Sequence, residues 1–114
     1  MCDQTQLNKI TDDVVENVRN VLEDKLYSII LYGSYARGDY DSESDVDIMV
    51  LADIDNNELP RYRDAICNIS SDISLENNIT ISIFLKNWKF FNDNVHILPF
   101  YKNVADEGVT VYGR

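Results

Sequence analysis

Apolar and polar positions follow three different patterns along the first half of the chain. Apolar residues first recur at helical spacing, which predicts an amphipathic helix over about residues 5–24, capped by Asp3 or Thr5. The positions that carry this pattern are Leu7, Ile10, Val14, Val18, Val21 and Leu22. A continuous apolar run over 28–32 then stops at Gly33, which is typical of a central strand covered on both faces. Residues 33–44 are rich in Gly, Ser, Asp and Tyr and predict a loop, with a short helical turn after Ser34.

Acidic and apolar residues alternate at the start of the next segment, which predicts a second strand over residues 45–51. Because successive side chains of a strand point to opposite faces, Asp45, Asp47 and Met49 should share one face. Val46, Ile48 and Val50 should share the other face. We therefore expect two acidic side chains to point the same way at the start of a buried strand.

The second half of the chain predicts a helix, a strand and two shorter elements. The helix has Pro60 in its first turn, ends at 76–78, and buries a stripe of apolar residues. That stripe consists of Leu59, Tyr62, Ile66, Ile69 and Ile73. Residues 79–85 alternate and are rich in β-branched side chains, which predicts a third strand. A short helix near 86–91 and a final strand over 109–112 complete the prediction. The fold class is therefore α/β (α+β), with a small mixed sheet flanked by helices in one domain over 1–114.

Composition and charge narrow the function. With 114 residues, of which 45 % are hydrophobic, the chain has the size and apolar content of one packed domain. No apolar run approaches the roughly 18 residues of a membrane span, and the first residues lack the pattern of a signal peptide, so we expect a cytoplasmic protein. A net charge of −10 argues against direct nucleic-acid binding, which depends on Lys and Arg neutralising phosphates.

Several residues have both a structural and a functional interpretation. Cys2 and Cys67 match no metal-binding spacing, and Cys67 lies in an apolar pattern, which favours a small core residue. His96, the single histidine, favours a packed or surface role over general-base chemistry. Tyr35 and Tyr40 either stack on a base or simply pack. Five aromatic residues near the C-terminus form either an exposed patch or, more in keeping with base rates, a satellite core: Trp88, Phe90, Phe91, Phe100 and Tyr101.

The stretch 33–47 combines features that suit a triphosphate. A buried strand that stops at Gly33-Ser34 exposes backbone N–H groups, and the hydroxyl of Ser34 can donate another hydrogen bond. Ten residues later come Asp45 and Asp47, a carboxylate pair of the kind that holds Mg²⁺ together with water and substrate phosphates. Arg37 could reach a phosphate, and it could equally form a salt bridge to Asp39 or Asp41. A Gly-Ser pair or an Asp-x-Asp alone is a weak signal, but the whole strand–loop–strand arrangement is specific.

This stretch resembles the signature of the DNA polymerase β-like nucleotidyltransferases, in which Gly-Ser is followed ten residues later by Asp-x-Asp. The Gly-Ser-Tyr-Ala-Arg-Gly and Ser-Asp-Val-Asp-Ile wording is similar to the minimal single-domain members (MNT), antitoxins whose partner is a helical HEPN ribonuclease toxin. The resemblance implies that Gly33 and Ser34 hold the triphosphate of ATP or another NTP and that Asp45 and Asp47 bind Mg²⁺. It also implies that AMP is transferred to a hydroxyl of the partner protein.

One feature departs from that family. Its members usually carry a third carboxylate on the next strand, but residues 79–85 contain no acid, and the expected site-facing residues are Thr80 and Ser82. A hydroxyl is a poor metal ligand and a poor base at neutral pH. Three acids elsewhere are candidate spatial substitutes: Glu76, Asp93 and Glu107. Two main hypotheses stay open, an active protein-modifying transferase and a catalytically impaired nucleotide-binding or masking antitoxin, with aminoglycoside modification as a distant third.

Overall fold

The computed structural model describes residues 3–41 and 43–113, so Cys2 lies outside the described residues. The elements follow one another as α1 (Gln4–Leu22), the 3-10 turn η1 (Glu23–Lys25), β1 (Leu26–Tyr32), α2 (Ser34–Arg37), β2 (Val46–Ala52), α3 (Leu59–Asn77), β3 (Ile81–Asn87), α4 (Trp88–Asn94), α5 (Pro99–Glu107) and β4 (Val109–Gly113). The predicted order of helix, strand, loop, strand, helix and strand is confirmed over the first three strands.

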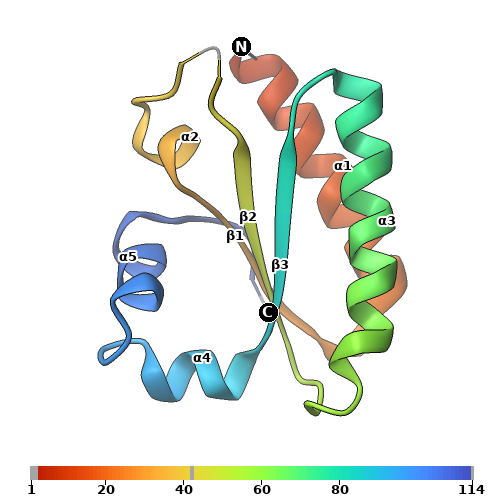
Figure 1. The fold of residues 1–114 in the computed structure, drawn as a ribbon, viewed down its shortest axis with the longest axis vertical. Helices are drawn as coiled ribbons and strands as arrows, with labels where there is room; N and C mark the ends of the chain where they lie inside the picture. The colour runs from red at the N-terminus through yellow and green to blue at the C-terminus, as the bar shows by residue number, and fades with distance from the viewer. Residues whose placement is uncertain (1–2, 42, 114) are drawn as a thin grey trace.

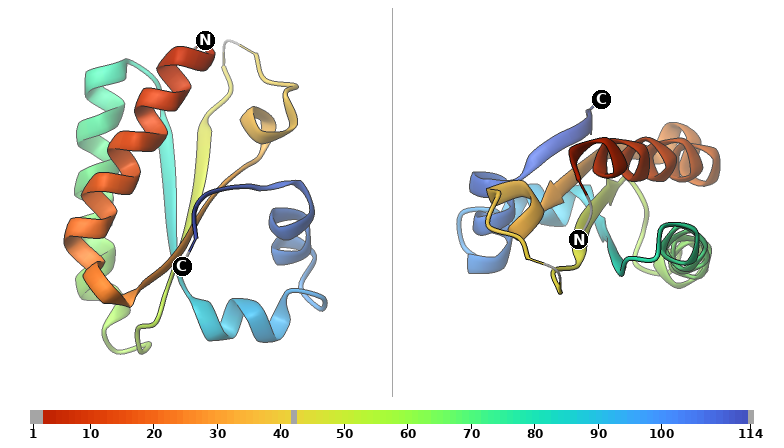
Figure 2. Two further views of the ribbon diagram at one scale, coloured as in Figure 1. Left: turned by 180° about the vertical axis from the view of Figure 1, so that it is seen from behind. Right: turned by 90° about the horizontal axis from the view of Figure 1, so that it is seen from above.

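Within the described residues the strands form one mixed sheet in the order β3-β2-β1-β4. β1 runs antiparallel to both β2 and β4, while β2 and β3 are parallel because α3 carries the chain back between them. α1 and α3 lie on one face of the sheet, and α4 and α5 lie on the other (Figures 1 and 2). The predicted small mixed sheet flanked by helices is confirmed.

The register of the central strands sorts their side chains into two cores. Ile29 and Leu31 of β1 join Val46, Ile48 and Val50 of β2 in the core under α1 and α3. The alternate positions form a second core under α4 and α5, made of Ile30, Tyr32, Met49, Leu51, Phe91, Tyr101 and Val104. β1 is therefore covered on both faces, as its continuous apolar run predicts.

Side-chain capping and backbone conformation fix the ends of the two long helices. The carboxylate of Asp3 caps α1 by accepting a hydrogen bond from the backbone N–H of Gln6 at 2.8 Å. Pro60 occupies the first turn of α3, and Asn78 ends that helix in the left-handed conformation with φ of 52°. Among the described helices, none is both long and apolar enough to cross a membrane.

Three expectations need correction. β3 begins at Ile81 rather than 79, because Asn78 and Ile79 still complete the exit from α3: the backbone N–H of Ile79 bonds to the carbonyl of Ser74. The expected helix over 86–91 begins at Trp88, and α5 was not predicted at all. Cys67 is exposed rather than a core residue, because it lies one step around α3 from the buried Ile66.

The C-terminal aromatic residues divide between core and surface. Phe91 and Tyr101 are buried and Trp88 is partly buried in the second core, which confirms the satellite-core interpretation for these three. Phe90 and Phe100 instead remain 53 % and 45 % exposed. His96 is exposed in the turn between α4 and α5.

Candidate active site

The turn from β1 into α2 depends on Gly33. Its φ of 77° and ψ of −157° belong to a region that only glycine adopts without strain. A Cβ added to Gly33 would lie 2.5 Å from Oδ2 of Asp47, so the carboxylate lies directly against the glycine backbone. The carbonyl of Gly33 accepts hydrogen bonds from the N–H groups of Ala36 and Arg37, both at 3.1 Å, and closes the turn. Ser34 is thus the first residue of α2, where an amide N–H has no acceptor inside the helix.

Asp47 occupies the centre of a row across three strands. It is paired in register with Tyr32 of β1 on one side and with Ser82 of β3 on the other. Burial raises the pKa of the Asp47 carboxyl, the nearby charge of Asp45 raises it further, and Arg37 opposes the shift. Burial and the charge of Asp47 likewise raise the pKa of the Tyr32 hydroxyl. The site therefore holds a half-buried negative charge that the protein compensates incompletely.

Asp45 lies one residue before β2 and is exposed. It lines a depression of about 400 Å³ with Ser44 and Thr80, whereas Asp47 lines a different pocket. Its charge nevertheless acts on Asp47, as the shift in the pKa of Asp47 indicates. The two acids are therefore electrostatic neighbours at the head of β2, and Asp47 is the more enclosed.

Four of the five residues expected to form the site line one pocket: Gly33, Ser34, Arg37 and Asp47. The pocket holds about 340 Å³, close to the lower end of the roughly 300–1,000 Å³ that is usual for small-molecule sites. The remaining lining residues come from β1 and α5: Tyr32, Phe100, Asn103, Val104 and Glu107. A pocket of this size accommodates part of a nucleotide, with the rest extending outward.

Arg37 is held between two carboxylates. Its Nε lies 3.2 Å from Oδ2 of Asp39, and its Nη1 lies 3.2 Å from Oε2 of Glu107. These hydrogen bonds to Asp39 and Glu107 raise the pKa of the guanidinium. The expected salt bridge to Asp39 is present, and the ion pair with Glu107 ties α2 to the end of α5. The guanidinium stays partly exposed and lines the pocket that contains Asp47.

The three acids considered as substitutes for the missing carboxylate have different surroundings. Glu107 lines the pocket but is paired with Arg37. Glu76 lines a depression with Asp13 and Asp72, in the helix layer on the other side of the sheet. Asp93 is exposed on α4. Among the described residues, no three acidic, histidine or cysteine side chains lie together as a metal-binding group. On β3, the residue paired with Asp47 is Ser82, as the alternation predicts.

The sequence did not predict that α5 forms one wall of the pocket that contains Asp47. Phe100, Asn103 and Val104 were not predicted to line the site, because the helix that carries them was not predicted. A usable signal was present, since Pro99 begins that helix and the buried Tyr101 and Val104 are three residues apart. Tyr35 and Tyr40 stack on each other with ring centroids 4.4 Å apart, which supports the packing role of the two considered.

Comparison with known proteins gives a consistent answer. The family model described as nucleotidyltransferase domain matches residues 9–109. From Methanocaldococcus jannaschii, the provisionally named protein adenylyltransferase MJ0604 is 30 % identical over 91 % of this chain and 96 % of its own length. A second protein of that organism with the same provisional activity, MJ0141, is 40 % identical over 68 % of this chain and 76 % of its own length.

Solved structures share the fold at low sequence identity. One described as a minimal nucleotidyltransferase of provisional assignment has a TM-score of 0.63 at 15 % identity, and it covers 95 % of both chains. A chain of a toxin–antitoxin crystal structure with AMP-PNP has a TM-score of 0.58 at 19 % identity over 91 % of this chain and 73 % of its own. A chain from a complex of tri-AMPylated HEPN toxin and MNT antitoxin of Shewanella oneidensis has a TM-score of 0.55 at 18 % identity, over 94 % and 72 %.

Proposed function

The chain belongs to the nucleotidyltransferase domain family, and we propose that it transfers AMP from ATP to a hydroxyl of a partner protein, as antitoxin to a HEPN ribonuclease toxin. The observation that carries the proposal is the contact between the Asp47 carboxylate and the Gly33 backbone, at a pocket that Ser34 and Arg37 also line. The provisional protein adenylyltransferase names of the relatives support the activity. The toxin–antitoxin complexes among the structural neighbours support the class of partner.

The residues at the head of β2 suit a divalent cation. Asp47 carries a carboxylate whose pKa is raised by burial and by Asp45, so the charged pair is destabilised until a cation neutralises it. Asp45 and Asp47 would hold Mg²⁺ through carboxylate oxygens, the ligand type that this ion prefers. When bound, the ion supplies charge neutralisation for the triphosphate and for the leaving pyrophosphate.

In the proposed reaction, the acceptor hydroxyl oxygen forms a bond to the α-phosphorus of ATP. The bond from that phosphorus to its bridging oxygen breaks, pyrophosphate leaves with the bonding electrons, and the hydroxyl proton passes to solvent water. Ser34 would donate a hydrogen bond to the phosphates, and Arg37, at the other end of α2, would orient them through its guanidinium. Such positioning supplies most of the catalysis in phosphoryl-type transfers.

A matched pair of double variants tests the site. Asp45→Asn with Asp47→Asn should abolish transfer of α-labelled AMP to a HEPN-type protein from the same genome, and should weaken Mg·ATP binding measured by calorimetry. The chain offers a control with the same Asp-x-Asp spacing, because Asp53 and Asp55 follow the other end of β2 and are exposed. Asp53→Asn with Asp55→Asn should leave both activities intact. Equal labelling by the two double variants would refute the assignment of Asp45 and Asp47 to the active site.

Ser82 favours a second candidate function. The β3 residue beside Asp47 is a hydroxyl rather than an acid, so the site lacks the side chain best suited to activating an acceptor. On this alternative, the protein masks its toxin stoichiometrically, with or without nucleotide. Mixing the purified pair without ATP and measuring ribonuclease activity separates the two functions. Full inhibition at a 1:1 ratio without ATP supports masking, whereas inhibition that needs ATP and survives removal of the antitoxin supports AMP transfer.

A further inference from the structure

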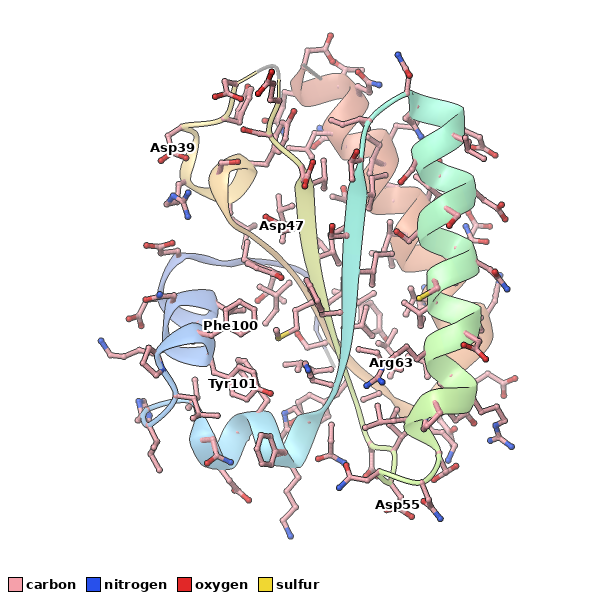
Figure 3. All side chains as sticks on the ribbon, in the orientation of Figure 1. Asp39, Asp47, Asp55, Arg63, Phe100 and Tyr101 are labelled. Carbon is pink, nitrogen blue, oxygen red and sulfur yellow. The ribbon has the colours of Figure 1, made fainter. Side chains whose placement is uncertain are left out.

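A second pocket lies at the edge strand β3, between α3 on one side and α4 and α5 on the other, away from the head of β2. It holds about 260 Å³ and brings together Arg63 of α3, Lys86 of β3, Phe90 of α4 and Tyr101 of α5. Figure 3 shows Arg63 across β3 from Tyr101 and Phe100, with Asp47 toward the other end of the sheet. The rest of the lining is neutral and consists of Asn56, Leu59 and Asn87. The pocket is therefore cationic and partly aromatic.

This pocket carries positive charge, whereas the whole protein carries a net negative charge. The chain has 20 acidic and 10 basic residues, and four basic residues of the described part form ion pairs: Lys25, Arg37, Arg61 and Lys102. Arg63 and Lys86 form no ion pair within residues 3–41 and 43–113, and no acid lines their pocket there. A pocket lined by two cations and by no acid favours an anionic occupant.

Aromatic rings connect this pocket to the candidate active site. Phe100, which lines the pocket of Asp47, contacts Tyr32 at 5.7 Å between ring centroids and Tyr101 at 5.9 Å. Tyr101 in turn contacts Phe90 at 6.1 Å. Phe90 and Phe100 are about half exposed, and so is Phe84 at 45 %, two residues before Lys86 on the same face of β3. The aromatic–cationic surface, defined as Phe84, Phe90, Phe100, Arg63 and Lys86, thus leads from the active-site pocket to the cationic pocket.

We propose that the aromatic–cationic surface docks a segment of the acceptor protein that carries acidic side chains next to an apolar one. The inference rests on the proposed function, because it names the surface that presents the acceptor hydroxyl to the site. The cationic pocket would receive a carboxylate, to which a guanidinium and an ammonium are complementary. The exposed rings would pack against the neighbouring apolar side chain, as aromatic residues do in protein interfaces. Nucleic acid does not fit, because it requires a broad positive field that a net charge of −10 does not supply.

The net charge makes the proposal sharply testable. A chain with a net charge of −10 should, without a local site, attract basic peptides and repel acidic ones. At physiological salt the Debye length is about 8 Å, so direct contacts outweigh the distant charges of the protein. A preference for acidic peptides would therefore require a local cationic site.

The experiment uses an array of nine-residue peptides in which a fixed Leu-Phe pair is flanked by Glu, by Gln or by Lys. Probed with the whole chain at 0.15 M salt, without nucleotide or metal, the Glu peptides should bind about three- to tenfold more strongly than their Gln counterparts. Arg63→Glu with Lys86→Glu should abolish this preference. The control Lys9→Glu with Arg19→Glu changes the net charge equally on α1, at two positions that do not line the cationic pocket, and should keep the preference. If the Lys86 change disturbs β3, Arg63→Glu alone, at an exposed position of α3, carries the test.

Three results would overturn the docking proposal: stronger binding of the Lys peptides by the unmodified chain, an acidic preference that survives in the Arg63/Lys86 variant, or binding of inorganic phosphate without binding of any peptide. The last result would reassign the pocket to a free anion. Failure of the proposed function is distinguishable, because the array needs neither ATP nor Mg²⁺. In a separate titration, the Arg63/Lys86 variant should bind Mg·ATP as the unmodified chain does.

Discussion

Replacing Gly33 by alanine is the most direct test of how the fold builds the site. The change should act in two ways, through backbone strain and through the position of Asp47. With φ of 77° and ψ of −157°, the backbone at Gly33 lies where an L-residue is strained. The new Cβ would also lie 2.5 Å from Oδ2 of Asp47, a separation that forces the carboxylate to move.

The chain contains a matched glycine that separates these two effects. Gly38 also has a positive φ, of 86°, but a Cβ there would meet no atom within 4 Å. Gly38→Ala should therefore cost about 1–2 kcal/mol of unfolding free energy from strain alone. Gly33→Ala should cost about 2–4 kcal/mol, because displacing Asp47 adds to a similar or larger strain. For a domain of this size, each kcal/mol lowers the melting temperature by roughly 3–6 °C.

Binding should discriminate between the two variants more strongly than stability does. Displacing the carboxylate that is proposed to hold Mg²⁺ by an ångström or more should weaken Mg·ATP binding by Gly33→Ala about ten- to hundredfold. Gly38→Ala should bind within about twofold of the unmodified chain. The assays are thermal unfolding followed by circular dichroism, and calorimetry at a temperature where both variants are folded. The reasoning is refuted if the two variants lose equal stability and Gly33→Ala keeps its affinity for Mg·ATP.

Further predictions concern charge, packing and metal. Because the pKa of the Asp47 carboxyl is raised above its usual 3.8, the folded state binds the carboxyl proton more tightly than the unfolded chain does. The ionised carboxylate therefore destabilises the fold at neutral pH. Asp47→Asn should therefore raise the melting temperature of the metal-free protein at pH 7, and the gain should vanish below about pH 3.8; a loss at pH 7 would contradict this. Glu107→Gln should tighten Mg·ATP binding about two- to fivefold by releasing Arg37, and weaker binding would instead make Glu107 a residue that positions Arg37. Phe91→Ala should cost about 3–5 kcal/mol in denaturant unfolding, and Phe90→Ala less than about 1 kcal/mol, because only Phe91 is buried; equal costs would contradict the assigned core. Removing Mg²⁺ with a chelator should abolish ATP binding, and calorimetric binding without a divalent cation would show that the loop alone suffices.

The fold was predictable where the periodicity is long and strong. The apolar repeat of α1 and the continuous run of β1 continue for enough residues that no other element fits them. The strand–turn–strand frame of the site was also predictable, because Gly33 and the alternation around Asp47 are local properties of the sequence. These features depend on neighbours in sequence rather than on contacts formed in three dimensions.

The errors lie where distant contacts decide the structure. α5 is nine residues long, and adjacent Phe100 and Tyr101 obscure its period because one faces outward and the other packs against the sheet. The pairing of Glu107 with Arg37 joins residues 70 positions apart, which no local pattern indicates. Cys67 follows the buried Ile66 by one position, and a helix turns each successive residue about 100° away, so membership of an apolar stretch did not decide its burial. The part of the site that α5 contributes was therefore harder to predict from the sequence than the strand–turn–strand frame.

The distribution of charge links the two proposals. At the head of β2, Asp47 lines the candidate active-site pocket and Asp45 lies near enough to raise the pKa of Asp47. The one cation lining that pocket in the described chain, Arg37, is already shared with Asp39 and Glu107. A polyanionic triphosphate can therefore bind favourably only if a metal ion brings the missing positive charge, so the site should select the Mg²⁺ complex over free ATP. At the other end of the aromatic–cationic surface, Arg63 and Lys86 are open to an anion from outside. The carboxylates at the head of β2 would thus select the metal complex of the nucleotide, and Arg63 and Lys86 would select the acidic side chains of the acceptor. These acidic side chains would be held away from the nucleotide that they would otherwise repel.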